Sequence, residues 1–579
     1  MSVKLAETAG FCPGVKRAVD RVLDVALSQG RGKIYTYGPL IHNPQTVELL
    51  KKRGIAPVAN IDDIPLGEEA TLVIRAHGIS PEDRRRIKRR GLKIVDATCP
   101  KVARVQAIIK KYVARGYTII IVGDKGHPEI IGLLGYAAGR GIVVESREDA
   151  VNLPVADKVG IVAQTTQRKD LYDEIIKIIK VKMPQAIVFD TICDSTEKRQ
   201  KELKDLASQM DAMVIVGGAN SANTRRLADI SERQGTPTFY IETSEELKEL
   251  PLGRYKSIGV SAGASTPNWI IDRVVNNITS FQAGGEKKSK SLFNFWLFLV
   301  RTDIYSAIGA GCLYLACALI QNLDLKLNNF LTASFYVYAM HVLNRFTDNK
   351  INIIGSFREA IYLKREPLFI FLAIAALISS LILAFAQGSI SFLLLSVISL
   401  LGVLYNIPVL PTGWRYRSVR ELPGSKNLSM SLAWAMVTAV LPATGAGFHL
   451  NTGMAVAFSF TFAVVFIRSV MTDILDMQND RLVGRETIPV IVGRETSEKI
   501  VKIIWGGLFL LLAFAFPAGW SASVSIALLL CLFYVLICFK LCDRRAALSG
   551  MELWGLLETN YIIAGVISLL WLVFIGRAY

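Results

Sequence analysis

The stretch Phe369 to Ala386, FIFLAIAALISSLILAFA, holds no charged side chain and is long enough to cross the hydrocarbon core of a bilayer as one helix. Similar apolar stretches recur throughout the sequence after Leu292. They account for most of the hydrophobic content of 51% and for the positive mean hydropathy of the chain. The second half of the 579 residues is therefore predicted to be an all-α polytopic membrane domain.

The number and orientation of the spans follow from the same pattern. Apolar stretches of near-spanning length predict about nine helices, with centres at Ala310, Tyr338, Ala375, Ser396, Ala435, Ala463, Phe509, Leu528 and Val566. Predicted outward loops hold almost no basic residue beyond Lys326, whereas predicted inward loops carry groups such as Arg481, Arg485, Arg494 and Lys499. Because basic loops stay inside, and the first residues lack the apolar stretch of a signal peptide, we expect a multi-pass cell-membrane protein with a cytoplasmic N-terminal half.

The first half has a different pattern. Short Val/Ile-rich runs, such as Ala70 to Ile74 and Ala212 to Val216, alternate with charged, helix-periodic stretches, which is typical of parallel sheets covered by helices. The polar, basic stretch Gln282 to Ser291 predicts a linker near a membrane surface. The expected domains are residues 1–281, a linker 282–291 and a membrane domain 292–579. The net charge of +17 is assigned to solvated surface and inward loops, because no aromatic-interleaved basic motif indicates nucleic acid.

Three of the eight cysteines stand outside the apolar spans. Cys12 lies in Gly-Phe-Cys-Pro-Gly-Val, Cys99 in Ala-Thr-Cys-Pro-Lys-Val and Cys193 in Thr-Ile-Cys-Asp-Ser-Thr, and each precedes a helix-like stretch. This pattern indicates an internal repeat with one thiolate per unit. Three converging thiolates could serve a zinc ion, an iron-sulfur cluster, or no ligand at all. A cubane cluster held by three cysteines leaves one iron open to a substrate.

Polar loops follow several of the predicted strands. His42, His77 and His127 each lie in a Gly/Pro-rich loop after a probable strand, where α/β sheets place ligand sites. Later loops supply small hydroxyls and amides in the segments Gln164-Thr-Thr, Asn220-Ser-Ala-Asn and Ser261-Ala-Gly-Ala-Ser. Each segment alone could be a helix cap. Together, donors of this kind beside helix starts predict a pocket for an anion such as phosphate.

These segments, in this order over residues 1 to about 280, closely resemble the 4-hydroxy-3-methylbut-2-enyl diphosphate reductase (IspH/LytB) family. The resemblance implies a three-lobed α/β trefoil around a [4Fe-4S] cluster. It also implies the last step of the methylerythritol phosphate pathway. In that step (E)-4-hydroxy-3-methylbut-2-enyl diphosphate loses its hydroxyl to two electrons and two protons, giving isopentenyl and dimethylallyl diphosphates. The electrons would come from a ferredoxin- or flavodoxin-type donor.

The resemblance also implies a role for individual residues. The cluster ligands are Cys12, Cys99 and Cys193, and the iron without a cysteine takes the substrate hydroxyl. The proton relay is Glu129 with Thr165 and His127. The substrate diphosphate is bound by His42, His77, His127, Ser221, Asn223 and Ser265. Ala222 departs from the Ser or Gly of many relatives, with little expected effect because its neighbours keep their donors. The alternative for this half is a zinc- or cluster-based redox sensor, which needs neither Glu129 nor the hydroxyl-rich loops.

A second motif lies in the membrane half. Asp473, Asp476 and Asp480 are spaced i, i+3 and i+7, so they share one helix face, where carboxylates can hold Mg²⁺ against a diphosphate. With the nine predicted spans and the trailing Gly484-Arg-Glu-Thr-Ile-Pro-Val, this motif resembles the UbiA superfamily of intramembrane prenyltransferases over roughly residues 292–579. The resemblance implies Mg²⁺-dependent transfer of a prenyl group from a prenyl diphosphate to an acceptor that is not identified.

The first aspartate motif of that superfamily is altered in this chain. Where the family shows Asn-Asp-x-x-Asp-x-x-x-Asp, the chain keeps Asn344 and Asp348 but has Arg345 and Asn352 in place of aspartates. The loss of two carboxylates weakens the binding of a divalent metal, whereas an arginine can contact phosphate directly. Two interpretations are therefore open, a bifunctional enzyme or a catalytically silent membrane anchor that binds prenyl lipids.

Overall fold

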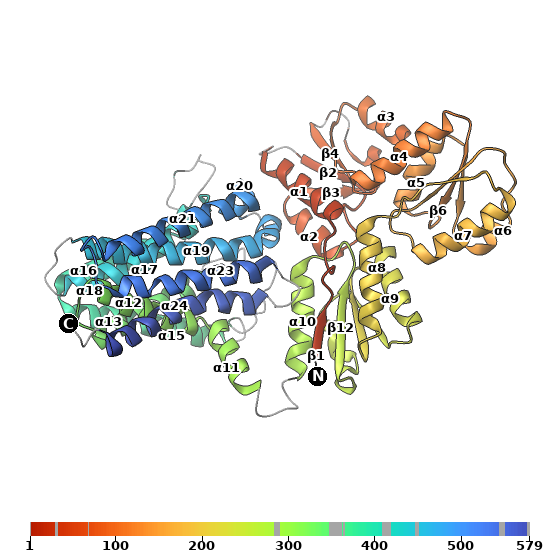
Figure 1. Ribbon diagram of the computed structural model, residues 1–579. Coiled ribbons are helices and arrows are strands. Elements are labelled where there is room, and N and C mark those ends of the chain that lie inside the picture. Colours follow the sequence, from red (N-terminus) through yellow and green to blue (C-terminus); the bar gives the residue numbers. More distant parts are fainter. Residues whose placement is uncertain are drawn as a thin grey trace. The chain divides into compact units, whose positions relative to one another are not determined.

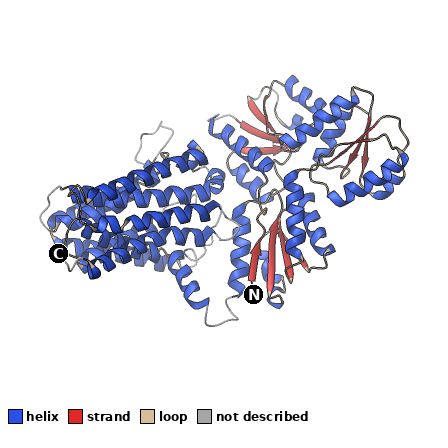
Figure 2. Cartoon of the chain, in the orientation of Figure 1, coloured by secondary structure: helices blue, strands red, loops and turns tan. Residues whose placement is uncertain are grey.

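The computed structural model describes residues 2–28, 33–65, 67, 69–282, 290–346, 362, 365–407, 411, 418–445, 451–483, 485–543 and 550–575. The chain divides into two compact units, Met1–Ala283 and Gly284–Tyr579. The first unit combines helices and strands, and the second is helical (Figures 1 and 2). Both features agree with the sequence prediction of an α/β half followed by an all-α half. Residues 283–289 of the predicted linker lie outside the described residues.

Three four-stranded parallel sheets form the first unit (Figure 2). Their orders are β3-β2-β4-β5, β7-β6-β8-β9 and β11-β10-β12-β1, so the same arrangement is repeated three times. The third sheet is completed by the first strand of the chain, in which Ser2 pairs with Ser257 and Leu5 with Val260. The strands are β1 (Ser2–Leu5), β2 (Lys33–Tyr37), β3 (Ile55–Val58), β4 (Ala70–Ile74), β5 (Lys93–Asp96), β6 (Thr118–Val122), β7 (Gly141–Val144), β8 (Val159–Ala163), β9 (Ile187–Val188), β10 (Ala212–Val216), β11 (Thr238–Ile241) and β12 (Ser257–Ala262).

One inner strand of each sheet, β4, β8 or β10, is buried along its whole length. These strands are the continuous apolar runs of the sequence, as expected for parallel strands covered by helices. The helices of this unit are α1 (Pro13–Ser28), α2 (Pro44–Lys52), α3 (Pro81–Arg89), α4 (Pro100–Val113), α5 (Pro128–Ala137), α6 (Arg147–Val151), α7 (Lys169–Lys182), α8 (Asp194–Ala207), α9 (Ala222–Arg233) and α10 (Asn268–Gln282).

A proline opens each of the helices α1 to α5. Proline suits the first helical position because its φ angle is already helical and the N–H that it lacks would have no helical partner. It also keeps the preceding residue out of the helical conformation. Cys99 and His127 accordingly stand in extended conformation at the N-caps of α4 and α5. The Cys-Pro and His-Pro pairs of the sequence thus place the candidate site side chains of Cys99 and His127 at helix N-termini.

The second unit consists of helices. They are α11 (Lys290–Arg301), α12 (Ile304–Ile320), α13 (Leu327–Phe346), α15 (Glu366–Gln387), α16 (Ser389–Leu404), α17 (Ser425–Ala435), α18 (Leu441–Thr444), α19 (Thr452–Val483), α20 (Ile488–Val492), α21 (Arg494–Ala515), α22 (Val524–Ala527), α23 (Leu529–Asp543) and α24 (Gly550–Phe574). A π-helical turn, Met436–Val440, joins α17 to α18.

Within the described residues, five helical segments are long and apolar enough to cross a membrane. A sixth is added if α11 and α12, which meet at 84°, count as one broken span. Each predicted span centre lies in a helix or, for Leu528, between α22 and α23. The apolar helices therefore indicate a multi-pass membrane domain, while the number of about nine spans stays a prediction.

Candidate functional site

Each of the three predicted cysteines follows an edge strand of its sheet, β1, β5 or β9, and stands at the start of a helix. Cys12 lies between β1 and α1, Cys99 is the N-cap of α4 after β5, and Cys193 is the N-cap of α8 after β9. All three line one cavity with an empty volume of about 890 Å³, measured out to the solvent at its mouth. The repeated strand order therefore brings together three thiols that lie far apart in the sequence.

The three thiols are close neighbours. A Cβ atom added at Gly14 would lie 2.6 Å from Cys99 Sγ and 3.9 Å from Cys12 Sγ. Burial raises the pKa of Cys99, the backbone N–H groups of Lys101 and Val102 lower it, and the thiols of Cys12 and Cys193 raise it further. Thiols that perturb one another in this way lie within electrostatic range, and three such sulfurs at helix N-termini fit an iron-sulfur cluster.

The substitution Gly14→Ala is expected to displace the Cys99 thiol and to lower the iron content per chain to less than about half of the wild-type value, because a contact of 2.6 Å is below the range of real Cβ contacts. Iron counting and visible absorption after anaerobic purification measure this effect. The matched control is Gly253→Ala, where an added Cβ meets no atom within 4 Å. A Gly14→Ala protein with full iron content would show that the thiols tolerate this displacement.

Three imidazoles form a second part of the cavity wall. His42 and His77 follow β2 and β4, and His127 caps α5. The ring centroids of His42 and His77 are 5.0 Å apart, those of His77 and His127 5.3 Å, and those of His42 and His127 6.0 Å. Burial lowers the pKa of all three, that of His127 to about 4. Repulsion from neighbouring imidazoles lowers the pKa of His77 and His127 further, and the charge of Arg75 lowers that of His42 further. The rings are therefore neutral at pH 7.

Several polar atoms around these rings have no partner. His42 Nε2, His77 Nδ1 and Asn223 Nδ2 are buried and make no hydrogen bond within the described chain. Buried polar groups without partners are rare in folded proteins and point to a ligand that completes them. Three neutral rings could coordinate a divalent metal or donate to an anion. The amide donor of Asn223 beside them favours the anion, because a metal accepts no N–H donor.

The loops after β10 and β12 close this wall. Ser221 caps α9 by accepting hydrogen bonds from Thr224 N at 3.3 Å and Thr224 Oγ1 at 2.9 Å, which leaves the Ser221 proton available for a ligand. Ser265 Oγ donates to His42 O at 3.3 Å. An added Cβ at Gly218 would lie 2.5 Å from the same carbonyl oxygen, so glycine allows these loops to approach each other. The structure thus brings together all the predicted anion-binding residues.

Glu129 lies in the same cavity and is 1% exposed. Its Oε1 accepts a hydrogen bond from Thr165 N at 2.7 Å, and its Oε2 accepts one from Thr165 Oγ1 at 2.9 Å. Burial raises the pKa of Glu129 to about 7, although the hydrogen bonds from Thr165 lower it. Thr165 O in turn accepts from Cys193 N at 2.9 Å. A continuous set of contacts therefore links a buried acid to a cysteine of the thiol cluster.

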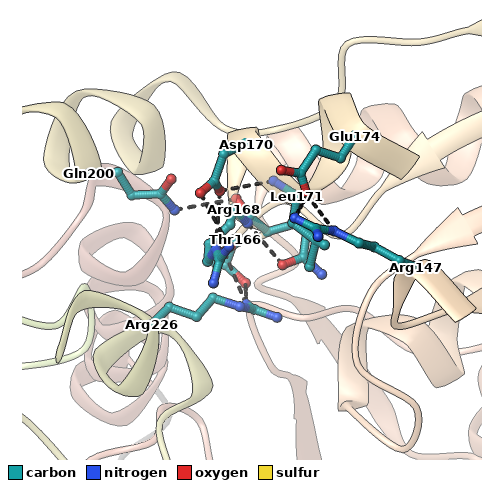
Figure 3. A network of polar contacts seen from close by, with 9 residues as sticks. Arg147, Thr166, Arg168, Asp170, Leu171, Glu174, Gln200 and Arg226 are labelled. Carbon is teal, nitrogen blue, oxygen red and sulfur yellow. Dashed lines mark hydrogen bonds and ion pairs between the residues drawn. The ribbon is translucent and has the colours of Figure 1, made fainter. Parts of the chain in front are cut away.

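The loop after β8 is held from both sides (Figure 3). Arg226 Nη1 of α9 donates to Thr166 O at 3.0 Å and to Thr166 Oγ1 at 3.2 Å. Gln200 Nε2 of α8 donates to Gln167 O at 3.3 Å. Beyond the loop, Arg168 pairs with Asp170 at 3.1 Å. These contacts hold the residues directly after Thr165, and Thr165 itself bonds to Glu129 through its N–H and its hydroxyl.

One cavity residue, Arg199 on α8, was not predicted from the sequence. It is 4% exposed, and its two Nη atoms donate to Ala262 O and Gly10 O, each at 2.7 Å. Its neighbours Glu197 and Lys198 made the segment look like a solvated helix face. The available signal was the helical spacing of the buried face, Thr196, Arg199, Gln200 and Leu203, which follows i, i+3, i+4 and i+7.

The three predicted aspartates of the membrane half all lie on α19. Asp473 is 1% exposed, and both of its oxygens accept hydrogen bonds, from Lys426 Nζ at 2.6 Å and from Asn427 Nδ2 at 2.8 Å. Asp480 lies 3.7 Å from Arg485, and Asp476 is half-buried. Lys426 and Asn427 of α17 thus bond to Asp473, the first of the three aspartates on α19.

The altered first motif makes a different contact. Arg345 Nη2 lies 2.7 Å from Asp303 Oδ2, and the hydroxyl of Tyr362 donates to the same oxygen at 2.8 Å. Asp303 is 2% exposed and sits in left-handed conformation, φ 57°, between α11 and α12. Asn344 Oδ1 accepts from Asn406 Nδ2 at 2.6 Å. Asp348 and Asn352 lie outside the described residues. Arg345, which replaces an aspartate of the motif, therefore forms an ion pair with Asp303, which lies outside the motif.

Comparisons with known proteins agree with the two resemblances. A family model described as LytB protein matches residues 3–279, and one described as UbiA prenyltransferase family matches residues 305–557. Over 287 residues, this chain is 44% identical to a 4-hydroxy-3-methylbut-2-enyl diphosphate reductase of Aquifex aeolicus (strain VF5). The match covers 49% of this chain and 98% of the relative. Over 281 residues, this chain is 42% identical to the protein of the same name from Geobacter sulfurreducens. This match covers 48% of this chain and 98% of the relative.

Solved structures also resemble parts of the chain. A structure of (E)-4-hydroxy-3-methyl-but-2-enyl diphosphate reductase is 44% identical, with a TM-score of 0.38, and the match covers 48% of this chain and 100% of the other. A UbiA homolog from Archaeoglobus fulgidus bound to DMAPP and Mg²⁺ is 17% identical, with a TM-score of 0.34, and covers 47% of this chain and 98% of the other. On the family matches, the chain belongs to the LytB family of 4-hydroxy-3-methylbut-2-enyl diphosphate reductases through residues 3–279 and carries a UbiA prenyltransferase family domain in residues 305–557.

Proposed function

We propose that residues 1–281 reduce (E)-4-hydroxy-3-methylbut-2-enyl diphosphate to isopentenyl diphosphate and dimethylallyl diphosphate. The observation that carries this proposal is one cavity in which three thiols, three buried neutral imidazoles and a buried acid meet. A redox sensor or a zinc site would use the thiols alone and would leave the unpartnered imidazole nitrogens unexplained. The relatives that bear the reductase name add support over almost their whole length.

The cavity residues fall into two groups, those that hold the cluster and those that bind the diphosphate. Cys12, Cys99 and Cys193 hold a [4Fe-4S] cluster, which supplies electrons and a Lewis-acidic iron for the substrate hydroxyl when it is bound. The diphosphate lies against the donors of His42, His77, His127, Ser221, Asn223 and Ser265. Neutral donors suit this task because burying a neutral hydrogen-bonding group costs less free energy than burying a charged side chain.

Glu129 supplies the proton that the departing hydroxyl needs in order to leave as water. In its acid form Glu129 donates from Oε2 to Thr165 Oγ1, 2.9 Å away, which reverses the bond that the carboxylate accepts from the same hydroxyl. As the carboxyl passes its proton to Thr165 Oγ1, the threonine hydroxyl passes its own proton to the substrate oxygen. His127 accepts a hydrogen bond from Glu129 N at its Nδ1, at 3.1 Å, so its proton is on Nε2 and is available to the diphosphate. The burial of Glu129 keeps a useful fraction protonated at neutral pH.

The pH dependence of kcat/KM should follow from the raised pKa of Glu129. Because the acid form is the active one and its pKa is about 7, kcat/KM is expected to fall about tenfold per pH unit above neutrality. Protonation of His127, whose pKa is about 4, should affect the profile only at acidic pH. Steady-state kinetics with a chemical reductant between about pH 6 and 9 test this expectation. A flat alkaline limb would argue against a protonated Glu129 as the donor.

The decisive experiment on the first activity starts with anaerobic purification of the full chain, with spectroscopy and iron counting. It is followed by an assay with the hydroxylated C5 diphosphate. About four irons per chain and formation of both C5 products are expected. Zinc in place of iron, or an iron-loaded protein that leaves the substrate unchanged, would favour the sensor.

We also propose a division into residues 1–281, a basic linker 282–291 and a membrane domain 292–579 with about nine spans. The N-terminal domain faces the cytoplasm, and a ferredoxin- or flavodoxin-type protein supplies its electrons. The orientation is supported by the basic residues of the predicted inward loops, such as Arg485 and Lys499.

A second candidate activity belongs to the membrane unit, namely Mg²⁺-dependent transfer of a prenyl group from a prenyl diphosphate to an unidentified acceptor. The UbiA family match and the three aspartates of α19 support it. The contacts of Asp473 with Lys426 and of Arg345 with Asp303 oppose it, because paired charges bind metal less readily. These contacts support the alternative of a silent anchor that binds prenyl lipids.

Radiolabelled prenyl diphosphates incubated with membranes, Mg²⁺ and candidate acceptors separate the two interpretations. For a transferase we expect Mg²⁺-dependent release of diphosphate, reduced about tenfold or more by Asp476→Asn because a carboxylate ligand is lost. Asp324→Asn, an exposed aspartate between α12 and α13, is the matched control. If no donor gives Mg²⁺-dependent release, the membrane unit is an anchor.

A further inference from the structure

Arg199 is a buried cation whose direct partners carry no net charge. Its guanidinium donates to the backbone carbonyls of Ala262 and Gly10, each at 2.7 Å, and the residue is 4% exposed. In the described chain no carboxylate forms an ion pair with it. Glu202, on the same helix, accepts instead from Thr8 N at 2.9 Å and from Thr8 Oγ1. A charge held away from water in this way is costly unless an opposite charge lies near it.

Three groups near Arg199 can carry a negative charge that favours its charged form, namely the thiols of Cys12 and Cys193 in the cavity and the carboxylate of Glu202. Arg199 lines the same cavity as Cys12 and Cys193, and both thiols favour its charged form, whereas burial lowers its pKa to about 10. The connection is also structural. Arg199 lies on α8, which begins at Cys193, and its bond to Gly10 O ties it to the segment that carries Cys12. The arginine thus joins two of the three cysteine segments and lines the cavity that holds their sulfurs.

We propose that Arg199 is the built-in counter-charge of the thiolate-bound cluster, and that it raises the reduction potential of the cluster by stabilising the more negative, reduced state. This inference rests on the proposed function, because it takes the three cysteines as cluster ligands. Arg199 is a positioning residue in this proposal, since it acts through the cysteine segments and their charge.

The physical reason is the change of charge on reduction. One added electron makes the centre more negative, and a fixed cation in a site of low dielectric constant lowers the energy of that state. Without the cluster, the guanidinium has only the distant compensation of Glu202, whose carboxylate bonds to Thr8 and forms no ion pair with Arg199 in the described chain. Its removal should therefore weaken reduction of the loaded protein without lowering the stability of the apoprotein.

The test compares the full-length wild-type chain with Arg199→Gln and Arg199→Lys by anaerobic redox titration, followed by electron paramagnetic resonance. At the wild-type midpoint, Arg199→Gln should lower the ratio of reduced to oxidised cluster about tenfold, equivalent to about 59 mV for one electron. Arg199→Lys should stay close to the wild type, because it keeps the charge. Two results overturn the proposal, an unchanged potential in Arg199→Gln and an equal shift in both variants.

Arg17→Gln is the matched control. Arg17 Nη1 also donates to a carbonyl beside a cluster cysteine, Thr98 O at 2.8 Å, but its side chain is partly exposed, so solvent screens its charge. Its removal should leave the potential unchanged. A shift as large as that of Arg199→Gln would show that buried and screened charges act alike, and the proposal would fail.

A second measurement covers a variant that does not take up the cluster. The melting temperature of the apoprotein then decides the outcome. If Arg199→Gln apoprotein melts no lower than wild-type apoprotein, the arginine serves the cluster, whereas a lower melting temperature assigns it to the fold and overturns the proposal. Wild-type protein that loads the cluster and shows the Arg199 effect, yet leaves the hydroxylated diphosphate unchanged, would remove the proposed function and keep this inference.

Discussion

Replacing Glu129 by glutamine is expected to lower kcat by ~10²- to 10⁴-fold while the cluster content and the affinity for substrate stay near wild type. The amide keeps the shape of the side chain but cannot release a proton to Thr165, whose Oγ1 is 2.9 Å from Glu129 Oε2. Single-turnover kinetics with prereduced enzyme, together with iron counting, separate the chemical step from assembly.

The matched control is Glu82→Gln, an exposed glutamate in the first turn of α3. It should leave kcat unchanged. Normal turnover in Glu129→Gln would remove the assignment of Glu129 as the proton source. Loss of the cluster in that variant would instead show that the carboxylate holds the loop of Thr165 and Cys193 in place.

The substitution Cys99→Ala should abolish stable cluster binding and with it the reductase activity. Cys99 reaches across the cavity to Gly14, so the other two thiols alone would leave the metal centre open on that side. Iron content, the visible spectrum and product formation after anaerobic reconstitution measure the effect.

Cys317→Ala provides the comparison within the same chain. This cysteine is buried in α12, where its sulfur lies 3.0 Å from Thr461 Oγ1, and it belongs to the membrane unit. The variant should keep wild-type iron content and reductase activity. Full iron content in Cys99→Ala would show that Cys99 is not a ligand, whereas loss in both variants would indicate general damage by cysteine removal.

The parallel α/β architecture could be predicted because it depends on local patterns. Apolar runs such as Ala70 to Ile74 and Ala212 to Val216 became fully buried strands, and Pro100 and Pro128 marked the helix starts. The completion of the third sheet by β1 could not be predicted. That pairing joins β1 to β12, which lies far along the sequence, and the local sequence of neither strand specifies which strand it pairs with.

The same distinction holds for the sites. Cys99 could be found because it shares a Cys-Pro-x-Val context with Cys12, and His127 because it lies in a Gly/Pro-rich loop after a probable strand. Arg199 was missed because charge on a helix normally indicates solvent, and only the burial of its whole face reveals its position. The Arg345–Asp303 pair was missed because the partner lies in a preceding helix junction.

The position of β1 in the third sheet has a consequence for biosynthesis. Ser2 is made 255 residues before its partner Ser257, which lies near the end of the N-terminal unit. At ~5–20 residues per second, the first strand must wait for more than about ten seconds before its sheet can close. The Cys12 loop, held by a bond from Cys12 N to Ala264 O, cannot reach its final place earlier. The three cysteines can therefore come together only after the segment that carries Ala264 has been made.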